Sequence, residues 1–241
     1  MKLSRVIVGL WLVALVGCAH GTRENGPINV GTYKEPIRVA CVGDSITFGA
    51  GVEDRERNHY PAQLGRMLGP KWEVRNYGVS GTTLLKKGDM PYWKRSEYQQ
   101  ALDWKPDVVI IKLGTNDTKP QNWKYKDEYV ADYEDLIGQF RKVNPAVRVY
   151  ACLPVPAFPG NWGIREAVIK GEVIPRVRQV AKESHVQLID LYAALEGKKE
   201  LVPDTVHPNA KGAGVMARTI YKVLTGKEAP QAVMAMAEVA E

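Results

Sequence analysis

The sequence predicts an α/β fold, a three-layer α/β/α sandwich built on a five-stranded parallel sheet. The strands are predicted from five short apolar runs, at Ile37–Val42, Trp72–Tyr77, Val108–Leu113, Val147–Leu153 and Val186–Leu191. Runs that are continuously apolar fit strands covered by helices on both faces, whereas half-exposed strands alternate with polar residues. Segments with helical spacing separate the runs, and this alternation favours a parallel sheet with right-handed crossovers.

The helices are predicted from segments in which apolar residues recur at steps of three and four. These segments are 60–68, 97–104, 129–143, 164–182 and 210–224. The pattern is clear in the third segment, where one stripe holds Tyr129, Tyr133, Leu136, Ile137 and Phe140. We expect Gly171 and Pro175 to interrupt or kink the fourth segment, because proline removes a helix hydrogen bond.

The first residues resemble an export signal. Lys2 and Arg5 precede an apolar run at residues 6–16, which is too short to cross a bilayer as a helix. The run ends in LVGC, residues 15–18, which resembles a bacterial lipobox. We therefore expect residues 1–17 to be a signal peptide of the lipoprotein type and Cys18 to be lipidated. An ordinary secretory signal, or an accidental cysteine near a cleavage site, is the alternative.

The rest of the chain divides into a tether, one domain and a tail. Residues 18–36 are rich in Gly, Asn, Thr and Pro and are expected to be a flexible tether. Residues 37–226 suit one globular domain, and 227–241 form a tail that is either a loose helix or disordered. The protein is thus expected to be an exported, membrane-anchored bacterial lipoprotein, periplasmic or on the cell surface, and a monomer or weak oligomer.

Composition excludes several kinds of partner. The net charge is +6 and no block of Lys and Arg is present, so a nucleic-acid partner is not expected. Cys41 and Cys152 lie inside apolar strand-like runs and are expected to be buried free thiols. No His, Cys or Asp cluster has the spacing of a metal site, and we expect neither metal nor other cofactor.

Glycines and small polar residues follow the predicted strands at the point where each strand ends. The segment GDS ends at Ser45 after the first strand, GVSG ends at Gly81 after the second, and GTND follows the third. Asp204 and His207 lie between the fifth strand and the last helix. Ligands bind at the carboxyl edge of open parallel sheets, so these residues are expected to gather at one site. For Ser45 alone, a helix-capping role is the alternative.

The residue types fit nucleophilic catalysis. A serine hydroxyl needs a neighbouring base, and of the four histidines only His207 has a carboxylate, Asp204, three residues earlier in a loop expected at the site. That carboxylate can accept from Nδ1 and leave Nε2 facing Ser45. A backbone N–H at Gly81 and the side-chain amide of Asn116 would be suitable donors for an oxyanion.

The segments GDSITFG, GVSGTT, GTND and DTVHPN, in this order, resemble the four blocks of the SGNH hydrolase superfamily, the GDSL esterases and lipases. The resemblance implies a flavodoxin-like SGNH fold and an acyl-enzyme mechanism. It also implies that Ser45 is the nucleophile, His207 the base and Asp204 the group that orients it. The oxyanion donors would be the backbone N–H groups of Ser45 and Gly81 with the Asn116 amide.

The substrate is expected to be an acylated carbohydrate. The chain is similar to sialate O-acetylesterase-like and acetylxylan-esterase-like members of the superfamily, which implies removal of O-acetyl groups. Trp93, Trp123 and Trp162 stand in polar loops and are candidates for stacking on sugar rings, unless they only pack these loops onto the domain. A lysophospholipase, thioesterase or arylesterase is the alternative. A glycan-binding lipoprotein without activity and a metal-dependent hydrolase are disfavoured.

Overall fold

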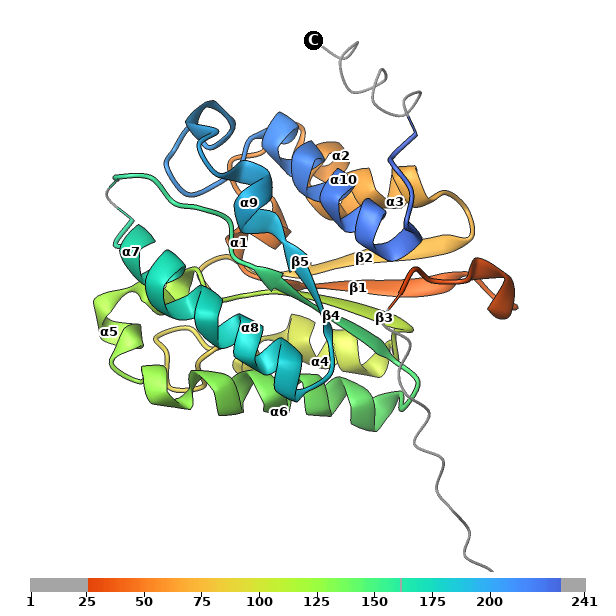
Figure 1. The fold of residues 1–241 in the computed structure, drawn as a ribbon, viewed down its shortest axis with the longest axis horizontal. Helices are drawn as coiled ribbons and strands as arrows, with labels where there is room; N and C mark the ends of the chain where they lie inside the picture. The colour runs from red at the N-terminus through yellow and green to blue at the C-terminus, as the bar shows by residue number, and fades with distance from the viewer. Residues whose placement is uncertain (1–25, 161, 231–241) are drawn as a thin grey trace, which may run out of the picture.

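A computed structural model describes residues 26–160 and 162–230. Its sheet has five parallel strands in the order β2-β1-β3-β4-β5, which confirms the predicted fold class (Figure 1). The strands are β1 Ile37–Gly43, β2 Trp72–Gly78, β3 Val108–Lys112, β4 Arg148–Leu153 and β5 Gln187–Asp190. Each predicted strand agrees within one residue at either end. This order is the flavodoxin-like one, with β1 and β3 side by side at the point where the order reverses.

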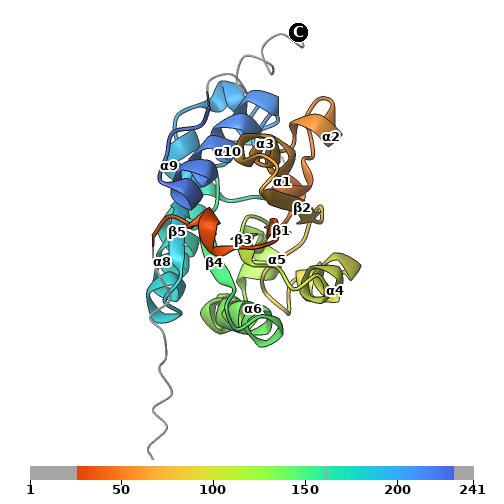
Figure 2. The ribbon, with the colours of Figure 1, turned by 90° about the vertical axis from the view of Figure 1, so that its right-hand side faces the viewer.

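Helices cover both faces of the sheet (Figures 1 and 2). The longer helices are α3 Tyr60–Leu68, α4 Ser96–Asp103, α6 Tyr129–Val143, α8 Ile174–Glu183 and α10 Ala210–Thr225. The shorter ones are α1 Ser45–Phe48, α2 Arg55–Asn58, α5 Pro120–Trp123, α7 Glu166–Val168 and α9 Leu191–Leu195. A π-helical turn, Ile169–Val173, separates α7 from α8, as the glycine and proline there predicted.

One apolar core lies on each side of the sheet. Successive side chains of a strand point to opposite faces, so Val39 and Cys41 face one core while Ala40 and Val42 face the other. The first core is closed by α3, α9 and α10, and the second by α4, α6 and α8. Cys41 and Cys152 are buried and free, in agreement with the prediction.

Part of the predicted tether packs on the domain instead. Ile28 is buried in the core under α10, and its N–H donates to the Leu224 carbonyl oxygen. A short 3₁₀ turn at Val30–Thr32 follows before β1 begins. The composition of residues 26–36 resembles a linker, but one isoleucine that fits between α10 and the sheet orders this stretch. The predicted signal peptide, Cys18 and most of the tail lie outside the described residues.

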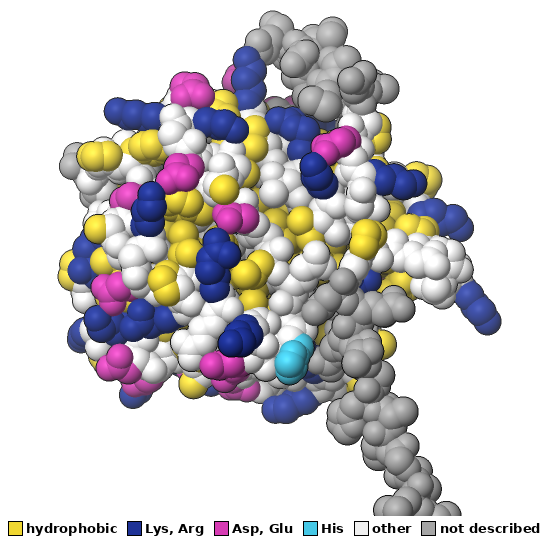
Figure 3. Space-filling model, in the orientation of Figure 1, with side chains coloured by type: hydrophobic (Ala, Val, Ile, Leu, Met, Phe, Trp, Pro, Cys, Tyr) yellow, Lys and Arg dark blue, Asp and Glu magenta, His cyan; other side chains and the backbone are white. Residues whose placement is uncertain are grey.

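The surface carries mixed charge. Figure 3 shows Lys and Arg side chains interspersed with Asp and Glu across this face, without one extended patch of either sign. Across residues 26–160 and 162–230, no helix has both the length and the apolar character that crossing a membrane requires. The same residues contain no group of three or more His, Cys, Asp or Glu side chains arranged to hold a metal ion.

Candidate active site

Ser45 is the first residue of α1, immediately after β1 reaches the carboxyl edge of the sheet. The turn is tight because glycines let neighbouring segments approach. A Cβ atom on Gly43 would lie 2.1 Å from the Thr47 hydroxyl, and one on Gly78 would lie 2.2 Å from the Phe48 nitrogen. Asp44 caps α1 by accepting from the Ile46 N–H at 3.0 Å.

Ser45, His207 and Asp204 form a continuous hydrogen-bonded chain. The Ser45 hydroxyl lies 2.8 Å from Nε2 of His207, and Nδ1 of His207 lies 2.6 Å from Oδ2 of Asp204. The other Asp204 oxygen accepts from the backbone N–H groups of Val206, at 3.0 Å, and His207, at 2.7 Å. The structure therefore brings together the three residues that the sequence singled out, while their catalytic roles stay a prediction.

The hydrogen bonds of Asp204 favour the ionised form of its carboxyl group. Burial alone would raise the pKa of Asp204, but hydrogen bonds from the His207 backbone, the His207 ring and the Val206 backbone bring that pKa below its ordinary value. The carboxylate is thus ionised at neutral pH and accepts the Nδ1–H of His207. In a neutral imidazole that keeps its proton on Nδ1, Nε2 is unprotonated and can take a proton from Ser45.

The loop that carries Asp204 and His207 is held in an uncommon conformation. Thr205, between them, has φ +80°, a left-handed value that costs a non-glycine residue energy. The Thr205 carbonyl oxygen accepts from the Phe158 N–H at 2.8 Å. The Trp162 indole N–H donates to the Asp204 carbonyl oxygen at 2.9 Å. The segment after β4 therefore fixes the loop from outside.

Gly81 and Asn116, the predicted oxyanion donors, follow β2 and β3. Gly81 has φ +81°, so its conformation suits glycine. The Asn116 side-chain nitrogen donates to the Thr82 carbonyl oxygen at 3.1 Å, which links the two turns. An amide NH₂ has two hydrogens, so one remains for a ligand. The hydrogen bond between Asn116 and Thr82 therefore places the turn after β2 beside the turn after β3, while the oxyanion-donor roles of Gly81 and Asn116 stay a prediction.

Asp117 holds these turns together. Its carboxylate accepts the N–H groups of Leu84, at 3.0 Å, and Leu85, at 2.8 Å. Complete burial raises the pKa of this carboxyl to about 7, although the two N–H donors act in the opposite direction. The segment after Gly81 is thereby tied to the segment that carries Asn116.

Sequence reasoning missed Lys112, the last residue of β3. Its side chain is completely buried, and Nζ lies 3.0 and 3.2 Å from the two Asp44 oxygens and 2.7 Å from the Thr115 hydroxyl. Burial lowers the pKa of Lys112, while Asp44 opposes that effect. The available signal was a lysine inside the otherwise apolar run VVIIKL, which directly precedes GTND.

The three candidate tryptophans occupy different environments. Trp162 is 52% exposed, and its ring meets the His207 ring edge-on, with centroids 5.2 Å apart. Trp123 is only 5% exposed and packs against Tyr129, so the structure gives no support to a role in substrate binding, which stays a prediction. Trp93 is partly buried, and its indole N–H donates to the Leu84 carbonyl oxygen, so it mainly packs its loop.

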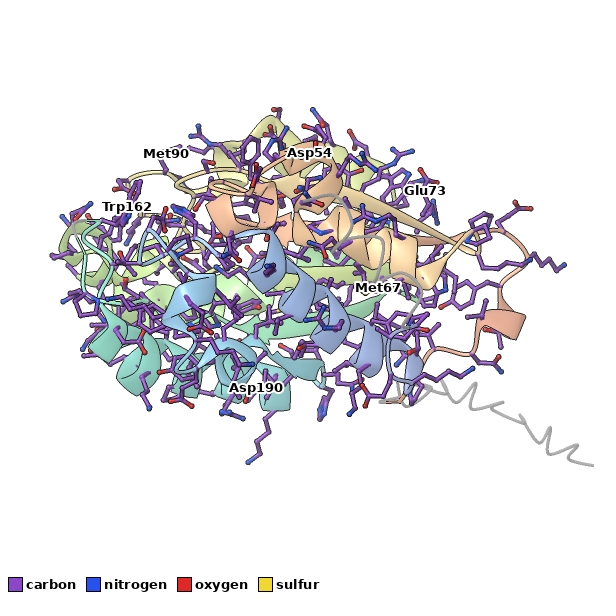
Figure 4. All side chains as sticks on the ribbon, turned by 90° about the horizontal axis from the view of Figure 1, so that it is seen from above. Asp54, Met67, Glu73, Met90, Trp162 and Asp190 are labelled. Carbon is purple, nitrogen blue, oxygen red and sulfur yellow. The ribbon has the colours of Figure 1, made fainter. Side chains whose placement is uncertain are left out.

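Exposed apolar side chains are few in the described part of the chain. The large ones are Phe48, Met90 and Trp162. Phe48 lies in α1 with Ser45, and a Cβ atom on Gly81 would lie 3.1 Å from the Met90 sulfur. Figure 4 shows Met90 and Trp162 at the same end of the molecule. Trp162 beside His207 and Met90 near Gly81 are therefore available to contact a ligand at the carboxyl edge of the sheet, whereas the Arg55 guanidinium lies over the Phe48 ring.

Comparison with known proteins identifies a matching family and a similar enzyme. The model of the GDSL-like Lipase/Acylhydrolase family matches residues 41–215. An acetylxylan esterase from Xylanibacter ruminicola is 44% identical over 206 residues, an alignment that covers 78% of this chain. It covers 43% of the relative, so the chain spans less than half the length of that protein.

Solved structures share the fold. A carbohydrate acetylesterase from Sinorhizobium meliloti has a TM-score of 0.64 at 20% identity, covering 77% of this chain and 97% of that one. An inhibitor-bound aryl esterase from M. smegmatis has a TM-score of 0.63 at 21% identity, with coverages of 77% and 97%. At these identities the likeness concerns the fold.

Proposed function

Because the chain belongs to the GDSL-like lipase/acylhydrolase family, a family of carboxylic ester hydrolases, we propose that it is a serine esterase that removes O-acetyl groups from carbohydrate. The observation that carries the proposal is the chain of hydrogen bonds from Ser45 through His207 to Asp204. Such a chain makes a serine hydroxyl reactive toward an acyl carbon.

In the proposed mechanism, Ser45 Oγ attacks the acetyl carbonyl carbon and its proton passes to Nε2 of His207. Asp204 keeps the proton of Nδ1 in place and stabilises the imidazolium. The oxyanion accepts hydrogen bonds from the backbone N–H groups of Ser45 and Gly81 and from the Asn116 amide. The imidazolium protonates the departing sugar oxygen. Water, deprotonated by the same imidazole, then releases acetate from Ser45.

Two observations support a sugar ester as substrate. The acetylxylan esterase from X. ruminicola is 44% identical to this chain over the aligned residues. The half-exposed Trp162 ring lies against His207, where it can contact the alcohol part of a bound ester. Aromatic rings with a polar edge contact both the apolar faces and the hydroxyl groups of a sugar.

The experiment that tests the proposal compares ester substrates. The protein should release acetate from acetylated xylan or an acetylated sugar and should hydrolyse 4-nitrophenyl acetate faster than the decanoate. A strong preference for the decanoate would contradict the sugar ester and favour a lysophospholipase or thioesterase. A fluorophosphonate should label Ser45 in the wild type, and absence of both labelling and turnover would leave a glycan-binding protein.

Substitution of Trp162 tests the sugar contact. Trp162→Ala should raise KM for acetylated xylan roughly fivefold, since an aromatic contact is worth about 1 kcal/mol. KM for 4-nitrophenyl acetate should change less, because that ester lacks a sugar ring. Trp162→Phe is the matched control, since it keeps an aromatic ring, although a smaller one, and removes the hydrogen bond to the Asp204 carbonyl oxygen.

Lipid anchoring at Cys18 is a further part of the proposal and rests on the LVGC segment alone. Two or more acyl chains hold a protein firmly at a membrane, whereas one chain holds it marginally. Cys18→Ala should therefore abolish incorporation of labelled fatty acid and move the protein to the soluble fraction, with kcat unchanged. Retained membrane association would contradict lipidation.

A further inference from the structure

A completely buried ion pair includes Asp44, the residue immediately before the proposed nucleophile. Lys112 and Asp44 are both inaccessible to solvent, and the Lys112 ammonium contacts both carboxylate oxygens of Asp44. Its third hydrogen bond goes to the Thr115 hydroxyl at 2.7 Å. An ammonium has three N–H donors, so the three acceptors match it completely.

Stability is a weak explanation for this pair. Moving two charges out of water costs more than their attraction often returns, and apolar pairs of similar volume frequently stabilise a core as well or better. The neighbouring residues of β3 are apolar and equally buried, so an apolar side chain at position 112 would suit the strand. The charges therefore call for another role.

The residues that Lys112 joins stand next to the two halves of the proposed catalytic centre. Asp44 caps α1 and immediately precedes Ser45, while Thr115 immediately precedes Asn116. The two turns follow different strands, β1 and β3, which pair with Gly43 opposite Lys112. One ammonium therefore bonds to both the turn of the nucleophile and the turn of the oxyanion amide.

The pair also controls charge near the reacting atoms. Asp44 adjoins Ser45 in the chain. In the proposed mechanism, negative charge develops on the carbonyl oxygen of the substrate when Ser45 attacks. An unpaired carboxylate there would oppose that charge, and the dry surroundings would strengthen the repulsion. The Lys112 ammonium offsets the Asp44 charge, so Asp44 can cap α1 without this penalty.

We propose that Lys112 is a positioning residue that holds the Ser45 turn and the Asn116 turn at a fixed separation and offsets the charge of Asp44. This inference rests on the proposed function, since it concerns the same centre. It assigns to Lys112 an effect on kcat, exerted through Asp44 and Thr115, with little effect on substrate binding.

Two substitutions of Thr115 test the positioning role without changing a charge. Thr115→Val keeps the shape of the side chain and removes the hydroxyl that accepts from Lys112, whereas Thr115→Ser keeps the hydroxyl. With 4-nitrophenyl acetate, Thr115→Val should lower kcat at least about tenfold with KM nearly constant, because small displacements of reacting groups are costly. Thr115→Ser should retain most of kcat.

The ion pair itself is tested by removing both charges together. Lys112→Met/Asp44→Asn leaves no uncompensated charge, so its melting temperature should stay close to that of the wild type. Its kcat and its rate of labelling by a fluorophosphonate should fall on the order of 100-fold. Val109→Ala, a buried change in the same strand, is the control: it should lower the melting temperature and leave kcat unchanged.

The outcomes separate a positioning role of Lys112 from a purely structural role of the ion pair. A folded double variant with low kcat, together with the loss in Thr115→Val and its recovery in Thr115→Ser, supports the inference. Wild-type kcat in the double variant or in Thr115→Val overturns it, and the pair is then only structural. If the double variant does not fold, the Thr115 variants decide. If the wild type neither turns over esters nor labels at Ser45, the proposed function fails and the inference falls with it.

Discussion

Asp204→Asn is the substitution whose effect follows most directly from the geometry. In the wild type, Oδ1 of Asp204 accepts two backbone N–H groups and Oδ2 accepts the Nδ1–H of His207. An asparagine can keep its single oxygen on the two backbone donors, which turns its NH₂ group toward Nδ1. Two donors cannot face each other, so the imidazole proton moves to Nε2.

The magnitude of the loss follows from that change of tautomer. A protonated Nε2 donates to Ser45 Oγ and cannot accept its proton, so general-base catalysis stops. The corresponding loss in a triad is about 10⁴-fold in kcat, or about 5.5 kcal/mol of barrier. Folding should suffer far less, because the two backbone hydrogen bonds persist, the asparagine NH₂ can donate to Nδ1 in place of the third, and the Asp204 side chain is 36% exposed.

The assay is kcat for 4-nitrophenyl acetate measured beside the melting temperature. Loss of about 1 kcal/mol would lower the melting temperature by roughly 2–4 °C in a domain of this size. Asp190→Asn is the matched control, since Asp190 caps α9 by accepting from the Ala193 N–H. It should leave kcat unchanged. If Asp204→Asn retained more than a tenth of the wild-type kcat, the orienting role of the carboxylate would be refuted.

Three further substitutions extend these expectations. Ser45→Ala should abolish turnover and fluorophosphonate labelling with an unchanged melting temperature, whereas a large fall in melting temperature would indicate a structural role. Asn116→Ala should lower kcat about 10²–10³-fold with a small change in KM, as for other oxyanion donors, and an unchanged kcat would exclude Asn116 from the oxyanion site. In the fold the pKa of Asp117 is raised by burial to about 7, from an ordinary 3.8, so the folded protein binds the extra proton between these values. The free energy of unfolding should therefore fall from pH 4.5 to 7 relative to Asp117→Asn, as measured by denaturant titration, and a constant difference between the two proteins would contradict the raised pKa.

Local pattern was sufficient for the strands and for the edge of the sheet where the site lies. A continuously apolar run such as VVII is typical of a strand covered on both faces of a parallel sheet, so the strand can be predicted from the residues alone. The carboxyl ends of parallel strands meet at one edge, so Ser45, Asn116 and His207 were predicted to gather there although Ser45 and His207 are 162 positions apart.

The succession of strands and helices, and the edge of the sheet where the candidate site lies, follow from the residues alone, and a resemblance implies the chemistry of that site. Which of these side chains are exposed and which are paired follows from the packing of the folded chain. Trp123 and Trp162 stand in similar polar loops, yet one is buried against Tyr129 and the other lies open beside His207. Lys112 and Asp44 pair across 68 positions, and Ile28 is ordered by a core that α10 completes. The burial and pairing of a side chain depend on contacts between elements that are distant in the chain. Hydrophobic periodicity shows only which face of a single helix or strand is apolar.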